Sequence, residues 1–151
     1  MSVGIGYDSH RFEDGRRLVL GGVEIDHPRG LAGHSDADVL THAVIDALLG
    51  AAGGGDIGAL FPDDDERWRG ADSIDLLRTA VGTVAGRIVN IDATLVCEEP
   101  RIGPYRAEME RILAEATSAR VSVKATTNEG MGWIGRGEGI ACLAVAQVEA
   151  E

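Results

Sequence analysis

Segments with the periodicity of β-strands alternate with segments with the periodicity of α-helices along the whole chain, and this alternation limits the possible folds. Apolar residues recur at every second position near the start of residues 2–12, with Val3, Ile5 and Tyr7 on one face. Further strand-like segments lie at 19–25, 88–97, 121–126 and 140–148, and helical periodicity occurs at about 36–52, 72–85 and 104–116. The interleaving predicts an α+β fold, a two-layer sandwich of a mixed β-sheet with helices on one face.

The segments between these elements carry turn and capping signals. Ser35 is a good N-cap for the first helix and would place Asp36 and Asp38 in the first turn, where the helix dipole favours negative charge. Residues 28–35 are predicted to form a loop. The acidic segment 56–70 is predicted to be a loop with at most one helical turn. Residues 130–139 are predicted to form a glycine-rich turn before the last strand.

Length, charge and composition exclude several classes of function. The 151 residues fit one domain, 1–151, and 14 basic minus 25 acidic residues give a net charge of −11. No nucleic-acid partner is expected, because phosphate backbones are bound by clustered Lys and Arg. No apolar segment approaches the roughly 20 residues that cross a bilayer, and no targeting segment precedes the first strand, so we expect no membrane partner and a cytoplasmic location. Cys97 and Cys142 lie in apolar segments, as buried thiols of a reducing compartment do.

Asp8, His10 and His42 form a candidate metal site. Residues two apart on a strand point the same way, so Asp8 and His10 can bind one ion, and His42 on the first helix would complete the set. One carboxylate and two imidazoles suit zinc and leave a fourth position open. An Asp-x-His pair also occurs on ordinary polar strand faces. Asp38 and Asp46 flank His42 at helical spacing, either as a solvated face or as carboxylates that orient the ligand.

Two further segments have polar groups suited to phosphate. Residues 33–36 lie at the predicted start of the first helix, where free backbone N–H groups favour an anion; an ordinary capped helix is the alternative. Residues 124–129 end a predicted strand with two hydroxyls and the carboxylate of Glu129, which suit phosphate oxygens and a hard cation such as magnesium. A polar turn explains the second segment equally well.

Five short motifs, in this order along the chain, together resemble the 2-C-methyl-D-erythritol 2,4-cyclodiphosphate synthase family. They are Gly6–His10 (GYDSH), Leu31–Val39 (LAGHSDADV), Gly55–Gly58 with Leu60–Asp63 (GDIG and LFPD), Lys124–Glu129 (KATTNE) and Gly135–Ala141 (GRGEGIA). The resemblance runs from Gly4 to about Val148.

The resemblance implies a metal-dependent cyclising lyase of the non-mevalonate isoprenoid pathway. Its substrate would be a cytidine diphosphate ester of methylerythritol that carries a 2-phosphate. That phosphate attacks the distal phosphorus of the diphosphate, a cyclic diphosphate forms and CMP leaves. The family is a homotrimer with active sites between subunits, one zinc per site and a second divalent cation, magnesium or manganese. The apolar segment 140–148 agrees with such subunit contacts.

The resemblance also assigns roles to residues. Asp8, His10 and His42 match the zinc ligands, Glu129 matches the ligand of the second cation, and His34 and Thr127 match residues that support the transition state. The other implied substrate contacts are Ser9, Ser35, Asp56, Ile57, Gly58, Phe61, Pro62, Asp63, Asp64, Asp65, Thr126, Asn128, Trp133 and Arg136, with His34, Thr127 and Glu129 again among them. Pro100, Arg101, Ile102 and Gly103 resemble the cytosine pocket.

Two positions depart from the family pattern. Arg101 stands where Lys is usual, and Trp133 stands where Phe is usual. The cytosine pocket of the family is largely main chain, so we expect Arg101 to be tolerated, whereas Trp133 could narrow the site or a cavity of the trimer. Two other functions fit the same ligands: a zinc hydrolase of phosphate esters, which would release a linear diphosphate, and a non-catalytic metal-binding trimer.

Overall fold

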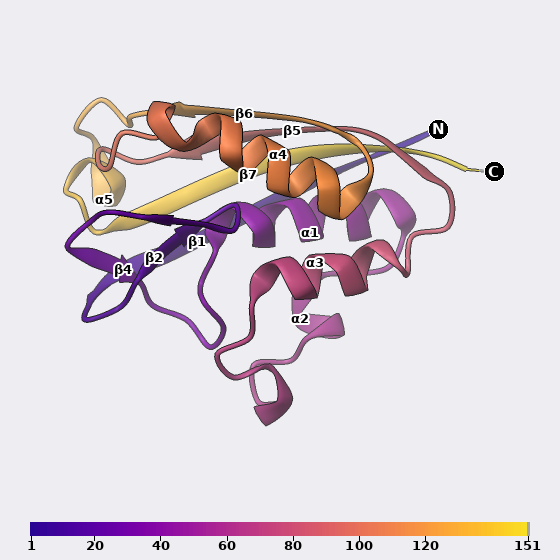
Figure 1. Cartoon of the computed structure of the whole chain (residues 1–151), viewed down its shortest axis with the longest axis horizontal. Helices are drawn as coiled ribbons and strands as arrows, with labels where there is room; N and C mark the ends of the chain where they lie inside the picture. The colour runs from indigo at the N-terminus through magenta and orange to yellow at the C-terminus, as the bar shows by residue number, and fades with distance from the viewer. Residues whose placement is uncertain (151) are drawn as a thin grey trace.

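The computed structural model describes residues 1–150 and has a curled, mixed β-sheet of five strands at its centre (Figure 1). The strand order is β4 (Arg29–Leu31), β1 (Ser2–Asp14), β7 (Gly139–Glu149), β5 (Arg87–Val96) and β6 (Arg120–Thr126). Only β5 and β6 run parallel; the other neighbours are antiparallel. The expected α+β fold with a mixed sheet is confirmed.

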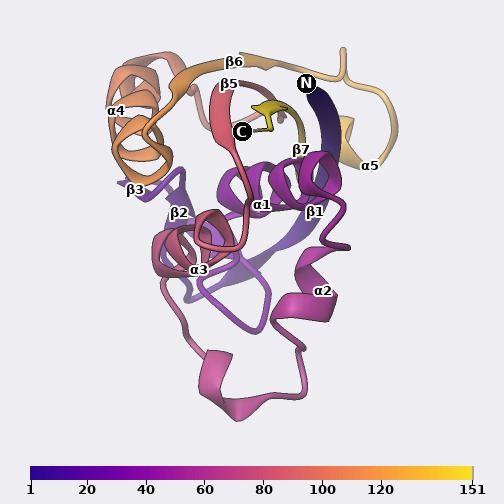
Figure 2. The same cartoon turned by 90° about the vertical axis from the view of Figure 1, so that its right-hand side faces the viewer.

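The longer helices cover one face of this sheet (Figures 1 and 2). Helix α1 (Val39–Ala52) packs on β1 and β7, α4 (Arg106–Thr117) packs on β6, and α3 (Ser73–Val81) lies against both helices. A Cβ atom at Gly4 or Gly6 would collide with the backbone of α1, at Ala47 and Ala43 respectively. These two glycines therefore let α1 lie directly on β1.

The second face of the sheet carries an exposed apolar patch. Val3, Ile5 and Tyr7 of β1 lie beside Leu143 and Val145 of β7, and each of the five side chains is more than 40% exposed. This is the face that the period-two pattern of residues 2–12 predicts. Within residues 1–150, no helix is long and apolar enough to cross a membrane.

The start of α1 differs from the prediction. Asp38, not Ser35, is the N-cap, so Asp36 and Asp38 precede the helix and do not lie in its first turn. The Asp38 carboxylate is fully buried and accepts hydrogen bonds from the backbone N–H groups of Gly21, Gly22 and Thr41. Gly21 and Gly22 form the turn between β2 (Leu18–Leu20) and β3 (Val23–Ile25), so the strand-like segment 19–25 lies in a hairpin. The contact of Asp38 with the β2–β3 turn therefore explains why Asp38, and not Ser35, is the N-cap.

Several connecting segments contain short elements that the sequence did not predict. Strand β4 lies within the expected loop 28–35 and pairs with the end of β1. The segment 56–70 has two turns of helix, α2 (Ile57–Leu60) and the 3-10 turn η1 (Glu66–Trp68), where one at most was expected. The glycine-rich segment contains α5 (Gly132–Gly135), and the 3-10 turn η2 (Gly103–Tyr105) precedes α4. Helix α3 ends at Val81, earlier than the expected 85.

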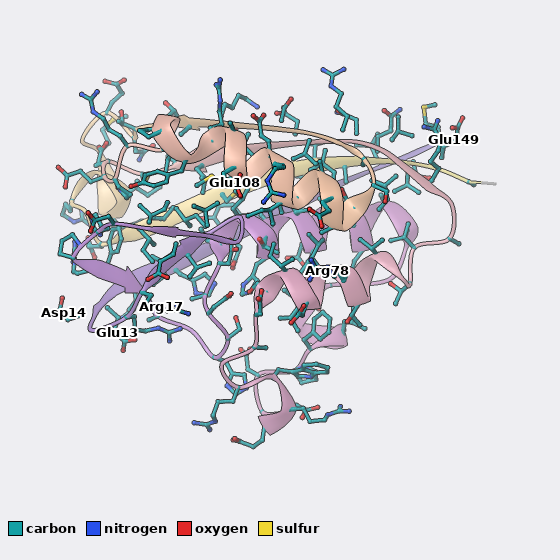
Figure 3. All side chains as sticks on the ribbon, in the orientation of Figure 1. Glu13, Asp14, Arg17, Arg78, Glu108 and Glu149 are labelled. Atoms are coloured by element: carbon teal, nitrogen blue, oxygen red, sulfur yellow. The ribbon has the colours of Figure 1, made fainter. Side chains whose placement is uncertain are left out.

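Many exposed arginines pair with nearby carboxylates. Figure 3 labels Arg78 on α3 and Glu108 on α4; Arg78 lies 3.0 Å from Asp75, and Arg111 lies 2.6 Å from Glu108. Such exposed pairs contribute little to the free energy of folding.

Candidate active site

Asp8, His10 and His42 come together where α1 crosses β1. One ligand atom from each residue lies within 4.8 Å of the other two. His10 Nε2 is 2.8 Å and His42 Nδ1 is 3.2 Å from the same atom, Asp8 Oδ2. The close packing of α1 on Gly4 and Gly6 makes this approach possible, because His42 lies on the side of α1 that faces β1.

The electrostatics of this cluster keep Asp8 ionised. Burial alone would raise the pKa of Asp8, but hydrogen bonds and charge from His10 and His42 outweigh burial and lower the pKa to about 2. Burial would lower the pKa of His10, yet the hydrogen bond and charge of Asp8 outweigh it and raise that pKa. An ionised carboxylate that favours protonation of a neighbouring imidazole also attracts a metal cation.

The protonation of His10 fits a metal ligand. Its Nδ1 lies 2.7 Å from the carbonyl oxygen of Ala32, which can only accept a hydrogen bond, so Nδ1 carries a proton. Nε2 donates to Asp8 Oδ2 when it carries a proton, and it would bind a metal through its lone pair once that proton has left. Two imidazoles and one carboxylate around a common point match the donor set of zinc sites that keep one position open.

A cavity of about 210 Å³ opens beside the three ligands. Several residues of the predicted site line it, namely His34, Ser35, Ile57, Gly58, Phe61 and Asp63, together with Asp8, His10 and His42. We call this cavity the metal pocket. His34 Nε2 lies 3.2 Å from the carbonyl oxygen of Asp65, which orients the ring. Sequence reasoning missed Trp68 and Leu76 in this lining, and it included Gly33 only as part of the predicted anion site at 33–36.

Asp38 and Asp46, the two carboxylates at helical spacing from His42, form no hydrogen bond to its ring. Asp38 binds the β2–β3 turn instead, and Asp46 accepts a hydrogen bond of 2.7 Å from the backbone N–H of Ile57. Asp46 therefore holds α2, whose N-cap is Asp56, against the pocket, and burial raises the pKa of Asp46. The suggestion that both carboxylates orient His42, or form a solvated face, is wrong.

The predicted anion site at the start of α1 is also wrong in its geometry. The helix begins at Val39, so residues 33–36 are not its N-terminus. One of their N–H groups is also committed, because Asp36 N donates to the Ala71 carbonyl. The next N–H along the chain, that of Ala37, donates to Ser35 Oγ. His34 and Ser35 nevertheless line the metal pocket, through the loop that precedes the helix.

A second cavity, of about 630 Å³, lies where β5 and β6 end. The predicted residues Pro100, Arg101, Ile102, Gly103, Thr126 and Thr127 line it, together with Cys97, Glu98, Pro104 and Ala125. We call it the nucleotide groove, after the cytosine pocket that the resemblance predicts at residues 100–103. Glu98, which sequence reasoning missed, accepts a hydrogen bond of 2.6 Å from the backbone N–H of Gly130 and so fixes the turn after Thr127.

The remaining predicted residues lie outside both cavities. Ser9, Trp133 and Arg136 line a third cavity, of about 670 Å³, with His10, Arg11, Phe12 and Arg29 among its other walls. Glu129 is exposed, with a φ of 54°, and Asn128 donates from its side chain to the Met131 carbonyl. Pro62, Asp64 and Asp65 lie on the loop after α2, where Asp65 pairs with Arg67.

His34 and Thr127, the two predicted catalytic residues, are therefore not brought together within one chain. They line different cavities, and in the described residues 1–150 these two linings share no member. Strand β1 is separated from β6 by β7 and β5, which corresponds to about 14 Å across the sheet. A single chain presents the predicted site as two separate halves.

Comparison with known proteins gives consistent matches over nearly the whole chain. This chain is 60% identical over 154 residues to the 2-C-methyl-D-erythritol 2,4-cyclodiphosphate synthase of Symbiobacterium thermophilum, and the match covers 98% of both chains. A bifunctional IspDF from Campylobacter jejuni matches with a TM-score of 0.92 and 41% identity over 96% of this chain, which spans 41% of that longer protein.

A solved 2-C-methyl-D-erythritol 2,4-cyclodiphosphate synthase in its CDP-bound form matches with a TM-score of 0.87 and 37% identity, covering 97% of this chain and 99% of the other. Residues 1–149 match the YgbB family. The chain therefore belongs to the YgbB family, that of the 2-C-methyl-D-erythritol 2,4-cyclodiphosphate synthases.

Proposed function

We propose how this chain carries out the reaction of its family, the cyclisation of 4-diphosphocytidyl-2-C-methyl-D-erythritol 2-phosphate to 2-C-methyl-D-erythritol 2,4-cyclodiphosphate and CMP. The observation that carries the assignment of the site is the convergence of Asp8, His10 and His42 beside a pocket that contains His34 and Ser35. The match over residues 1–149 supports one catalytic domain.

Asp8 Oδ2, His10 Nε2 and His42 Nδ1, which face one another, would hold zinc in the metal pocket. Bound zinc supplies positive charge that polarises the phosphoryl oxygens of the substrate. His34 and Ser35 offer donors to the phosphate in the same pocket, and the turn at Asp56–Gly58, held by Asp46, together with the loop from Phe61 to Asp65 forms the wall for the methylerythritol.

The nucleotide groove holds the cytidine end of the substrate. Ile102 is buried while Arg101 and Gly103 are exposed, so the backbone of residues 100–103 forms much of the wall. The CDP-bound relative supports a cytidine nucleotide as the ligand. Thr126, Thr127 and Asn128 lead from this groove to Glu129, whose carboxylate would hold magnesium or manganese on the diphosphate, since oxygen ligands suit these ions.

The reaction needs little proton transfer from the protein. The 2-phosphate of the substrate is already anionic at neutral pH; its oxygen forms a bond to the distal phosphorus, and the bond from that phosphorus to the bridging oxygen of CMP breaks. The main barrier is the approach of two anions, which positioning and positive charge reduce. His34 and Thr127 donate hydrogen bonds to the phosphoryl oxygens as charge builds on them.

A homotrimer completes the site. One chain presents the metal pocket and the nucleotide groove as separate halves, so a neighbouring copy would bring its Thr127 to the His34 of the first. The exposed apolar patch of Val3, Ile5, Tyr7, Leu143 and Val145 supports such assembly, because a monomer would leave this area in water.

Phosphorus NMR of the product tests this function directly. Incubation with the cytidyl substrate, magnesium and zinc is expected to give the two coupled signals of a cyclic diphosphate and the signal of CMP. A linear diphosphate that contains oxygen from the solvent would instead identify a zinc hydrolase, and the absence of turnover would identify a metal-binding protein.

A further inference from the structure

Two hydroxyl groups contact Nε2 of His42, the ring nitrogen that faces away from Asp8. Nε2 lies 2.8 Å from Ser73 Oγ and 3.2 Å from Ser35 Oγ, on the side away from Asp8. A neutral imidazole carries one proton, and only the nitrogen without it can bind a metal. The group that fixes this proton on Nε2 therefore decides whether Nδ1 is free to act as a ligand.

Ser73 can only accept a hydrogen bond from His42, because its own proton is committed. Its hydroxyl donates to Asp36 Oδ1, and its backbone N–H donates to the other oxygen of the same carboxylate at 3.0 Å. An ionised carboxylate has no proton to return. Ser73 is fully buried, so no solvent competes at this position. The chain Asp36–Ser73–His42 thus places the proton on Nε2 and the lone pair on Nδ1.

Asp36 is itself fixed by the segments that precede α1 and α3. The backbone N–H of Asp38 donates to Asp36 Oδ1 at 3.2 Å, and the N–H of Asp36 donates to the Ala71 carbonyl at 3.1 Å. Ser73 is the first residue of α3, whose N-cap is Asp72. The carboxylate therefore also aligns the start of α3 with the loop before α1, and with it the hydroxyl that meets His42.

The hydroxyl of Ser35 would favour the opposite tautomer of His42, with the proton on Nδ1. Its Oγ accepts from the backbone N–H of Ala37 at 3.3 Å and keeps a proton that it could donate to Nε2. The proton of His42 would then move to Nδ1 and point at Asp8, which would block the ligand position. The Asp8 carboxylate, 3.2 Å from Nδ1, attracts a proton to that nitrogen until a cation takes its place. The shorter contact to Ser73 and the commitment of the Ser73 proton favour the arrangement in which Nε2 is the donor to Ser73.

We propose that Asp36 and Ser73 are positioning residues of the metal site, which hold the proton of His42 on Nε2 and present Nδ1 to the zinc. The inference rests on the proposed zinc site and adds two residues to it. Partners of this kind, which hold a ligating histidine by its second nitrogen, typically change metal affinity by about ten- to a hundredfold when they are removed.

Zinc affinity, measured by competition with a chromophoric chelator, tests the proposal without any assay of activity. Ser73→Ala and Asp36→Asn are each expected to weaken zinc binding by about ten- to a hundredfold. The double variant should be about as weak as the single ones, because the two residues act in one chain of hydrogen bonds. Ser73→Thr keeps the hydroxyl and should restore most of the affinity.

Asp72→Ala is the matched control for the stability of α3. It removes the hydrogen bond from the N–H of Ile74 to the Asp72 side chain and leaves Asp36, Ser73 and His42 in place. Its melting temperature should fall while its zinc affinity stays within about twofold of the parent, because a lost cap affects stability and not the ligand. An equal loss of zinc affinity in Asp72→Ala would show that a loose helix explains the effect, and would overturn the proposal.

Nitrogen-15 NMR of the histidines in the metal-free protein gives a second readout. The parent should show His42 with its proton on Nε2, and Ser73→Ala should lose this preference. Zinc affinity within twofold of the parent in Ser73→Ala, with an unchanged tautomer, would overturn the positioning role alone. Zinc that remains bound in His42→Ala would instead overturn the proposed metal site, so the two failures are distinguishable.

Discussion

The metal pocket and the nucleotide groove differ in how far one chain has prepared them for the substrate. In the metal pocket, each side chain that faces the ligand position is held by another group of the same chain: His10 by Ala32, His42 by Ser73 and Asp8 by both histidines. In the groove, Thr126 and Thr127 are exposed, and among residues 1–150 their side chains form hydrogen bonds only within their own turn. The first half is preorganised, whereas in the proposed trimer the second would depend on its ligand and on a neighbouring subunit.

The largest effect is expected from the preorganised half. His42→Ala should remove zinc and lower turnover by at least about a thousandfold, because Asp8 and His10 alone cannot close a tetrahedral site. Metal analysis of the purified variant, together with the cyclisation assay, measures both quantities. A variant with stoichiometric zinc and the turnover of the parent would contradict the assignment.

A smaller effect is expected at Glu129, which lies on the turn that follows the nucleotide groove. Glu129→Gln should lower turnover by about a hundred- to a thousandfold and shift the magnesium dependence, because a charge is lost beside the converging phosphates. Zinc should stay bound, since Glu129 is not part of the three-residue cluster. The measurement is a magnesium titration beside the parent enzyme. If the two curves and the maximal rates coincide, Glu129 is only a polar turn residue and does not bind the second cation.

Mixing variants of the two halves tests whether they come from different subunits. His42→Ala and Thr127→Ala are each expected to be nearly inactive, but when they are refolded together, every mixed trimer should contain one site with both halves intact. Random assembly from equal amounts should then restore about a quarter of the parent activity. Activity that stays at the level of the separate variants would place both halves in one subunit.

The smallest effect is expected from Arg101→Lys in the groove. Arg101 is exposed and takes part in no ion pair among residues 1–150, so exchange of its side chain leaves the backbone wall unchanged. The KM for the cytidyl substrate should stay within about threefold of the parent, as for other exposed charges. A tenfold rise in KM would show that the guanidinium contacts the nucleotide.

The sequence predicted periodic elements well and connecting segments poorly, for physical reasons that particular residues illustrate. The patterns of β1, β5, β7 and α1 follow from burial on one face and are visible locally. Strand β4 has only three residues, Arg29–Leu31, and exists because it pairs with the end of β1. Ser35 and Asp38 are both good caps, and the buried turn at Gly21 and Gly22 decided between them.

In the candidate site, too, local features were predictable from the sequence, whereas features that depend on tertiary contacts were not. Residue type and spacing suggested Asp8, His10 and His42, the motifs that resemble a known family supported the suggestion, and the structure brings these three together. The same motifs did not indicate that His34 and Thr127 lie in different cavities, because that depends on the order of strands in the sheet. The bond between Asp36 and Ser73 joins residues 37 positions apart and leaves no periodic signal in the sequence.

The two glycines beneath α1 set a limit on which sequences can keep this chemistry. A side chain at Gly6 would meet the backbone at Ala43, the residue after His42, and would push the helix away from β1. Metal–ligand distances tolerate changes of only about 0.2 Å, so even a methyl group there would move His42 out of reach of an ion held by Asp8 and His10. Natural variation at position 6 should therefore be as restricted as at the ligands themselves, although this position never touches the metal.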